Sequence, residues 1–239
     1  MRNETFDTPE PPELRINLPS GDVRVQTSAE ATETYVELSG PNEDDARIEQ
    51  RRDQIVIEIE RKKLFGFKGD HTLLVTAPFG TRVDSNFASA DFEGVGRLGN
   101  VSIDTASGDV RLAAVDGRLE VNSASGDVRV EFVGDDLRVN SASGDVTIGE
   151  AEHDAKIRTA SGDIAIRSAL RGKIDITSAS GDVEVGIRPG SKVFIDASSM
   201  SGDMTSELDV TDAPLTDSGG PSIDFRARTM SGDVTVRRG

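Results

Sequence analysis

The sequence predicts an all-β protein whose larger part is a single-stranded β-helix, a solenoid in which the chain winds through one coil of strands after another. Three observations predict this fold: a tripeptide that recurs at a fixed spacing, strict alternation of apolar and polar residues around each copy, and the lack of a comparable helical pattern over residues 83–239. A fixed short period indicates that each repeat is one structural unit stacked on the next.

The recurring tripeptide is Ser-Gly-Asp, which occurs eight times in the 239-residue chain. A degenerate copy, Ser89–Asp91, stands one period before the second Ser-Gly-Asp, and from Ala90 to Gly162 the spacing is 18 residues each time. Beyond Gly162 the spacing lengthens to 19, 21 and 30 residues. The glycines of the eight copies are Gly21, Gly108, Gly126, Gly144, Gly162, Gly181, Gly202 and Gly232.

Apolar and mostly polar residues alternate on both sides of each tripeptide. Leu137 and Val139 precede one copy, for example, and Val146 and Ile148 follow it. Such alternation over short β-branched runs indicates half-buried strands, so each repeat is predicted to hold two or three short strands bent at corners. Parallel stacking at about 4.8 Å would turn the apolar positions into continuous buried ladders, and seven or eight coils over 83–239 would make a rod roughly 35–40 Å long.

The first 82 residues follow a different pattern. Residues 1–13 are acidic and rich in proline, so we expect a disordered tail. Residues 14–82 begin with a copy of the repeat and continue with longer strands and turns, which predicts a small antiparallel β-sheet. This sheet would cap the N-terminal end of the solenoid, where an uncovered coil would expose a bare strand edge. The large rings of Phe79, Phe87 and Phe92 would fill the first coil, at the boundary with the cap.

An inserted loop at about 205–223, rich in Pro, Gly, Ser and Asp, precedes the last pair of predicted strands. No capping element follows that pair, and three alternatives remain for its edge. Its arginines keep other strands away, the inserted loop folds over it, or it meets the end of another copy. We predict self-association into a dimer or polymer through the solenoid ends. The residues of this predicted edge are Val234, Val236, Arg237 and Arg238.

The composition disfavours several classes of function. The chain has no cysteine and only two histidines, His71 and His153, which lie far apart in the sequence and are expected at the surface. We therefore predict no metal site, no cofactor and no catalytic triad. A net charge of −16 and an aromatic content of 4% disfavour nucleic-acid binding. The acidic, lysine-poor composition is typical of proteins that work in concentrated salt.

No apolar run is long enough to span a membrane, and the N-terminal residues lack the apolar core of a signal peptide. We therefore expect a cytoplasmic protein, with peripheral attachment at the inner membrane face. Exposed aromatic rings with a cationic collar are how soluble proteins enter the membrane interface, and one segment between predicted strands has this composition. The alternative is that both rings pack on the cap sheet or the solenoid, since exposed rings are costly. The candidate residues for docking on a membrane or partner are Lys62, Lys63, Leu64, Phe65, Phe67 and Lys68.

The aspartates of the repeat predict a ladder of carboxylates along one corner of the solenoid. Like charges about 4.8 Å apart repel each other and need relief. We expect hydrogen bonds from backbone N–H groups at the corner, with diffusely bound salt cations or a specific metal site as alternatives. The corner glycines provide a backbone geometry that side chains would forbid. The structural corner ladder consists of Gly108, Asp109, Gly126, Asp127, Gly144, Asp145, Gly162, Asp163, Gly181, Asp182, Gly202, Asp203, Gly232 and Asp233.

The order of these parts resembles a known family. The chain has a predicted N-terminal sheet, then Val75-Thr-Ala-Pro78-Phe-Gly80, then tandem Ser-Gly-Asp-Val coils. This order is similar to that of the bacterial and archaeal "putative adhesin" family of β-helical domains, over about residues 14–239. That family has no established activity, so the resemblance implies a fold rather than a reaction. With its acidic composition, the chain also resembles archaeal halofilins, which are bactofilin-like proteins concerned with cell shape. Bactofilins polymerise end to end and associate with membranes, whereas a folded cap favours contact between C-terminal ends.

The sequence therefore predicts a structural, non-catalytic protein. The preferred hypothesis is a bactofilin-like cytoskeletal scaffold, associated with the membrane and involved in cell-shape maintenance, with another bactofilin-like protein as a further partner. The alternative is an adhesin-type or adaptor binding module that uses the repeated Ser/Asp face of the solenoid. A carbohydrate-active enzyme is the third class, but a residue set present in every coil indicates structure rather than one active site.

Overall fold

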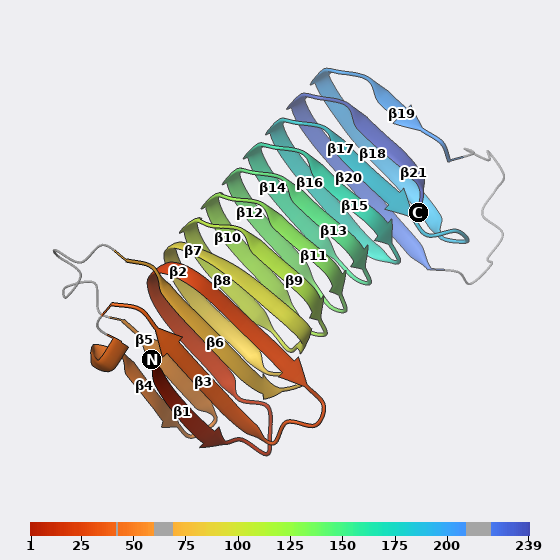
Figure 1. Ribbon diagram of the computed structural model, residues 1–239. Coiled ribbons are helices and arrows are strands. Elements are labelled where there is room, and N and C mark those ends of the chain that lie inside the picture. The colour runs from red at the N-terminus through yellow and green to blue at the C-terminus, as the bar shows by residue number, and fades with distance from the viewer. Residues whose placement is uncertain (42, 60–68, 209–220) are drawn as a thin grey trace.

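The computed structural model describes residues 1–41, 43–59, 69–208 and 221–239. Within these residues the chain forms 21 strands of one continuous sheet, which winds around itself, and a single short 3-10 helix. Figure 1 shows a rod of stacked coils, with the N-terminal strands at one end and β18 (Lys192–Ser201) and β19 (Met204–Ser206) at the other. The all-β solenoid predicted from the sequence is confirmed.

Each regular coil from β8 (Val101–Ser107) onward consists of two short strands joined by a Gly-Asp corner. The first regular coil is formed by one long strand, which bends at Ala90. The strands of the regular coils are β7 (Arg82–Leu98), β8 (Val101–Ser107), β9 (Val110–Val115), β10 (Leu119–Ser125), β11 (Val128–Val133), β12 (Leu137–Ser143), β13 (Val146–Ala151), β14 (Ala155–Ser161), β15 (Ile164–Ala169), β16 (Gly172–Ser180) and β17 (Val183–Ile187).

Successive coils pair in parallel and in register. β10 pairs with β8 and β12 on one side of the rod, while β11 pairs with β9 and β13 on the other. Leu119 lies opposite Val101 and Leu137, so equivalent residues of successive repeats lie side by side. The alternation in the sequence thereby becomes two polar outer faces around a shared apolar interior.

The interior of the rod is a set of apolar ladders with a hydroxyl ladder beside the corner. Val121, Val139 and Ile157 occupy one ladder and are completely buried. Three residues before each corner glycine of the regular coils from β8 onward, a Ser or Thr also points inward. In the coils of β8, β10, β12 and β14 its hydroxyl donates to the carbonyl two residues further on, as Ser141 Oγ does to Ser143 O at 2.9 Å. This local bond satisfies a buried hydroxyl where the strand turns into the corner.

The N-terminal strands begin with a further coil rather than with the antiparallel cap predicted over 14–82. β2 bends at Gly21 and pairs in parallel with β7, from Glu13 opposite Arg82 to Gln26 opposite Val95. The other edge of β2 pairs in parallel with β5 and β6. The strands of this part are β1 (Arg2–Asp7), β2 (Glu13–Ser28), β3 (Glu33–Ser39), β4 (Arg47–Arg51), β5 (Gln54–Glu58) and β6 (His71–Pro78), and the 3-10 helix is η1 (Glu43–Asp45).

Antiparallel strands cover this first coil from outside. β4 pairs with β5, β3 pairs with β6, and β1 pairs with β3, all in antiparallel fashion. β1 lies within residues 1–13, which were expected to be disordered. The expectation was wrong because residues Arg2–Asp7 alternate between exposed and half-buried positions and Phe6 packs against the core. The N-terminal edge of the solenoid is therefore covered on both of its strands.

Two predictions about large side chains near this boundary need correction. Phe87 and Phe92 are buried with their ring centroids 6.0 Å apart, as expected for rings that fill the first coil, but Phe79 is 38% exposed. His71 was expected at the surface and is completely buried, with Nε2 3.0 Å from the carbonyl oxygen of Pro41. It begins β6 directly opposite Gly21, where the missing side chain leaves room for the backbone of His71.

The coils at the C-terminal end are stacked out of chain order. β20 (Ser222–Ser231) pairs with β16 on one side and β18 on the other, and β21 (Val234–Arg238) pairs with β17 and β19. The last coil of the sequence therefore lies between the coil of β16 and β17 and the coil of β18 and β19. The inserted loop predicted at about 205–223 lies partly outside the described residues, at 209–220.

Candidate interaction surfaces

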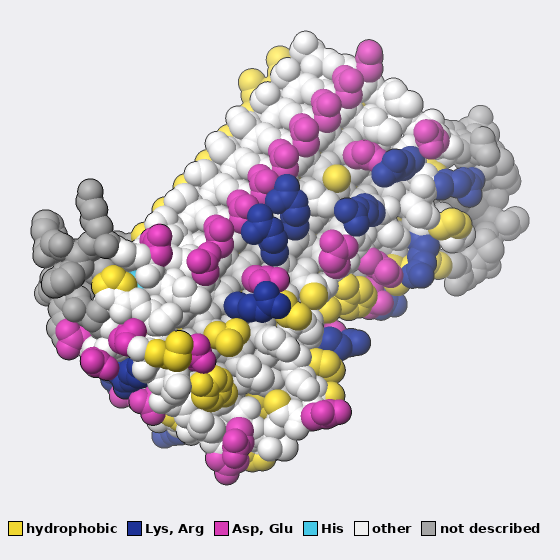
Figure 2. All heavy atoms as spheres, in the orientation of Figure 1, with side chains coloured by type: hydrophobic (Ala, Val, Ile, Leu, Met, Phe, Trp, Pro, Cys, Tyr) yellow, Lys and Arg dark blue, Asp and Glu magenta, His cyan; other side chains and the backbone are white. Residues whose placement is uncertain are grey.

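The corner ladder runs along the rod as a line of acidic side chains, which is visible in Figure 2. Apart from that of Asp203, in the last described coil, each carboxylate accepts a hydrogen bond from the backbone N–H of the equivalent aspartate in the next coil, at 2.8–3.0 Å. Two arginines form ion pairs with carboxylates of the ladder, Arg111 with Asp109 at 2.6 Å and Arg129 with Asp127 at 2.9 Å. These ion pairs reduce the repulsion between neighbouring carboxylates. The ladder is therefore a structural device that joins successive coils.

The pKa of Asp127 reflects these contacts. The N–H of Asp145 holds the pKa of the Asp127 carboxyl below its ordinary value of 3.8, and Arg129 lowers it further, while partial burial opposes both. The described residues contain no group of three or more His, Asp or Glu side chains placed to hold a metal ion. The ladder consequently consists of single carboxylates in a row, and all of them except Asp203 accept a hydrogen bond from the next coil.

The corner glycines are required by two separate constraints. Gly126 and Gly144 have φ angles of 117° and 112°, in the region that disfavours residues with a Cβ. A Cβ on Gly144 would also lie 2.2 Å from the carbonyl oxygen of Gly126 in the preceding coil. The glycine thus permits both the corner and the close stacking that places each N–H against a carboxylate.

The predicted self-association edge at the chain's end is not an edge of the rod. Val234 lies between Val183 and Met204, and Val236 lies between Val185 and Ser206, so both are buried. Arg237 and Arg238 lie opposite Gly186 and Ile187 of β17, and Arg237 forms an ion pair with Glu184. The placement was wrong because the last coil of the sequence stacks directly on β16 and β17.

The real end of the rod is the coil of β18 and β19, residues 192–206, which we call the end coil. Among the described residues β18 pairs with β20 alone and β19 with β21 alone. Val193, Ile195 and Ala197 continue the inner ladder but are only partly buried. Phe194, Met200 and Met204 are 61%, 83% and 50% exposed. The end coil therefore presents an unpaired strand edge together with exposed apolar side chains.

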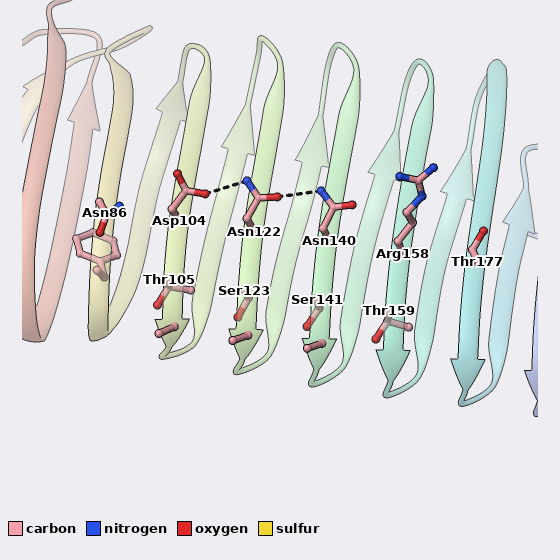
Figure 3. A pocket seen from close by; sticks show the side chains of 14 residues that line it. Asn86, Asp104, Thr105, Asn122, Ser123, Asn140, Ser141, Arg158, Thr159 and Thr177 are labelled. Atoms are coloured by element: carbon pink, nitrogen blue, oxygen red, sulfur yellow. Dashed lines mark hydrogen bonds between the residues drawn. The ribbon is translucent and has the colours of Figure 1, made fainter.

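A shallow trough of about 670 Å³ lies on the other candidate surface, the outer face of β8, β10, β12 and β14. Its floor consists of the small side chains of Ala106, Ala124 and Ala142. Figure 3 shows a polar row beside this floor, in which the Asn122 amide donates to Asp104 at 2.8 Å and the Asn140 amide donates to Asn122 at 2.9 Å. The trough therefore carries a row of polar side chains, one from each successive coil, that includes Asp104, Asn122, Asn140 and Arg158.

The cationic and aromatic segment predicted for membrane or partner docking lies outside the described residues. It consists of Lys62, Lys63, Leu64, Phe65, Phe67 and Lys68. No helix in the described parts of the chain is long and apolar enough to cross a membrane.

The end coil carries a sequence signal that the repeat analysis missed. Met200 and Met230 stand two residues before their corner glycines, where the preceding coils have Ala142, Ala160 and Ala179. Larger exposed side chains at this one position mark the coils at the rod's end. The longer spacings of 21 and 30 residues mark the same coils, but they do not reveal their order.

These observations define a class of protein: a parallel β-solenoid of short, nearly identical coils with one covered end. The sequence matches the Toastrack DUF4097 family over residues 12–237, and the chain belongs to that family. No curated protein matches the sequence.

Two solved structures show related architecture. A "putative lipid binding protein" from Parabacteroides distasonis is 17% identical, with a TM-score of 0.55 over 98% of this chain and 96% of that chain. A "putative adhesin" from Bacteroides fragilis is 15% identical, with a TM-score of 0.44 over 98% of this chain and 96% of that chain. At 17% identity the first likeness shows the fold alone. Neither of the two is named a halofilin or a bactofilin.

Proposed function

We propose that this protein is a non-catalytic scaffold, a rigid rod that associates with another protein molecule through its end coil. The observation that carries this proposal is the unpaired edge of β18 beside Phe194, Met200 and Met204. Natural proteins cover or charge such edges when they function alone, and apolar strand edges are templates for further pairing. Support for a non-catalytic role comes from the outer faces, where successive coils repeat the same kinds of side chain.

The finer hypothesis is a bactofilin-like role in cell-shape maintenance at the inner face of the membrane. A rod with one covered end and one open end is suited to joining two attachment points. The membrane contact would be made by the segment of Lys62–Lys68, whose Phe65 and Phe67 stand between cationic residues. A second bactofilin-like protein is an alternative partner for the end coil.

Sedimentation tests both parts of this proposal. The full chain would be centrifuged in about molar KCl, where exposed charges are screened within about 3 Å, with and without equimolar phosphatidylglycerol and phosphatidylcholine vesicles. Self-association without vesicles supports the scaffold, and co-sedimentation that Phe65→Ser with Phe67→Ser abolishes supports the membrane contact. A monomer at every concentration, with no vesicle binding, refutes both.

The trough favours a second candidate function, a binding module of the adhesin or adaptor type. Its polar row of Asp104, Asn122 and Asn140 could hydrogen-bond to an extended polar ligand that follows the rod. Affinity electrophoresis with dextran and polygalacturonate tests this alternative. Binding that Ala124→Arg abolishes would support it, provided that Thr147→Arg, on the other outer face, leaves binding intact. Failure of both polymers to bind would remove these two glycan classes.

A further inference from the structure

The end coil differs from the other coils in the described part of the chain because it has one stacking partner instead of two. Its ladder residues Val193, Ile195 and Ala197 lie opposite Ile223, Phe225 and Ala227 of β20. These three residues of β20 are at most 2% exposed. At the position that corresponds to Phe194, the next two coils along the rod carry Asp224 in β20 and Lys173 in β16. A large apolar side chain thus stands in place of charged ones at the coil whose outer edge no described strand pairs.

A second copy of the chain is the occupant that fits this edge, and one part of the argument is geometric. Continuing the rod in parallel would require the N-terminal edge of another copy, but β5 and β6 already occupy that edge on β2. In another copy the end coil is likewise paired on one side only among the described residues, and it has the same cross-section. Two such ends can meet about a two-fold axis, with strands of the two copies antiparallel and the two sheets continuous.

The side chains of β18 select one register for that contact. Phe194 and Met200 stand three residues before and after Ala197, and both face outward. Antiparallel pairing centred on Ala197 therefore places Phe194 opposite Met200 of the second copy, twice in each dimer. The two most exposed apolar side chains of β18 then cover each other, and nearly the whole strand is paired.

The charges of the end coil agree with this register. Pairing centred on Ala197 places Lys192 opposite the corner of Gly202 and Asp203 in the second copy. Asp203 carries the last carboxylate of the corner ladder in spatial order, because it follows Asp233 and no described coil follows it. At the other ladder positions the carboxylate accepts an N–H of the next coil. At Asp203 the ammonium group of Lys192 from the second copy would take the place of that N–H. A centre at Asp196 would instead place two carboxylates opposite each other, which is destabilising.

We propose that two copies of this protein form a tail-to-tail dimer, in which β18 pairs antiparallel with β18 of the second copy, centred on Ala197. This inference rests on the proposed scaffold function and specifies its partner. The dimer is a double-length rod with a covered, N-terminal end at each tip, so assembly stops at two copies. The chain's C-terminal strand β21 contributes no edge to it.

Analytical ultracentrifugation of the full chain in about molar KCl tests the dimer. We expect a dimer for the wild type and a dissociation constant at least about a hundredfold higher for Phe194→Asp and Met200→Asp, since a carboxylate would be buried against an apolar side chain. Both side chains are exposed in the single chain, so these variants should fold. Met230→Asp is the matched control, because Met230 is exposed but lies one strand away from the edge.

Cysteine cross-linking tests the register, and the chain has no cysteine of its own. We expect Ala197→Cys to form a disulfide-linked dimer under oxidation and Phe194→Cys to form none. Cross-linking by Phe194→Cys alone would overturn the register. Self-association that survives Phe194→Asp and Met200→Asp would overturn this interface and leave the scaffold proposal standing. A monomeric wild type with the amides of β18 protected from exchange would overturn both, since the chain would then cover its own edge.

Discussion

Replacing Asp145 by alanine or asparagine measures what one rung of the corner ladder contributes to the stability of the rod. The Asp145 carboxylate accepts the N–H of Asp163 at 3.0 Å, and its own N–H donates to Asp127 at 3.0 Å. Asp145→Ala removes the acceptor and the charge together. Asp145→Asn removes the charge and keeps an acceptor oxygen in the same place. The two variants therefore separate hydrogen bonding from repulsion.

The expected magnitudes follow from the two opposing terms. A hydrogen bond to a charged group contributes about 1.5–3 kcal/mol, and the exposed corner places this one at the low end. Each neighbouring carboxylate, about 5 Å away, repels with about 0.8 kcal/mol in water, so two neighbours cost about 1.6 kcal/mol in dilute salt. In about molar salt the screening length falls to about 3 Å and most of this repulsion disappears.

Urea unfolding monitored by far-ultraviolet circular dichroism provides the measurement. In about 2 M KCl, where repulsion is screened, we expect Asp145→Ala to lower the free energy of unfolding by about 1–2 kcal/mol and Asp145→Asn to change it by less than about 0.5 kcal/mol. In dilute salt the loss in Asp145→Ala should nearly vanish, and Asp145→Asn should be more stable than the wild type. Equal destabilisation by both variants in concentrated salt would refute the reasoning, since the acceptor oxygen would then be irrelevant.

Three further predictions concern the corner. Gly144→Ala should lower the free energy of unfolding, measured in urea, by about 3 kcal/mol, because a clash with Gly126 adds to backbone strain of about 1–3 kcal/mol. Gly190 has a φ angle of 89° and open space around it, so Gly190→Ala should lower the free energy of unfolding clearly less. The lowered pKa of Asp127 implies stability that is present above its ordinary value of 3.8 and is lost as the pH falls through the lower, folded value. Urea midpoints measured across that acidic range should therefore fall less steeply for Asp127→Asn than for the wild type. Ser141→Ala should cost about 1 kcal/mol in thermal unfolding, because the buried hydroxyl donates to Ser143 O; an unchanged midpoint would mean that this bond does not hold the strand end.

The solenoid was predictable because its signal is local and repeated. Leu137, Val139, Val146 and Ile148 alternate within a few residues of their corner, and the strand period follows directly from such alternation. The corner position of Asp145 was predictable for the same reason, since a Gly-Asp pair between two alternating runs indicates a turn. The strands and the corner within each coil can therefore be predicted from the sequence of that coil.

The parts that could not be predicted depend on contacts between distant segments. The spacing between Gly202 and Gly232 shows that a coil is followed by an insertion, but it does not show which coil stacks on β17. The burial of His71 depends on Gly21, fifty residues earlier, and the strand at residues Arg2–Asp7 depends on β3. The predicted edge at Val234 and Val236 was consequently assigned to a strand that lies inside the stack, between β17 and β19.

The exchanged order of the last two coils has a consequence for how the nascent chain completes the rod. A solenoid can add one unit at a time to a folded end, in the order in which the ribosome delivers them. Here residues 192–206 emerge before the coil that attaches them to the rod, because β18 and β19 pair with β20 and β21. Residues 192–206 can therefore join the stack only after β20 and β21 have emerged and stacked on β16 and β17. A stop codon anywhere between about residues 207 and 221 would leave a rod two coils shorter, with an unattached strand pair.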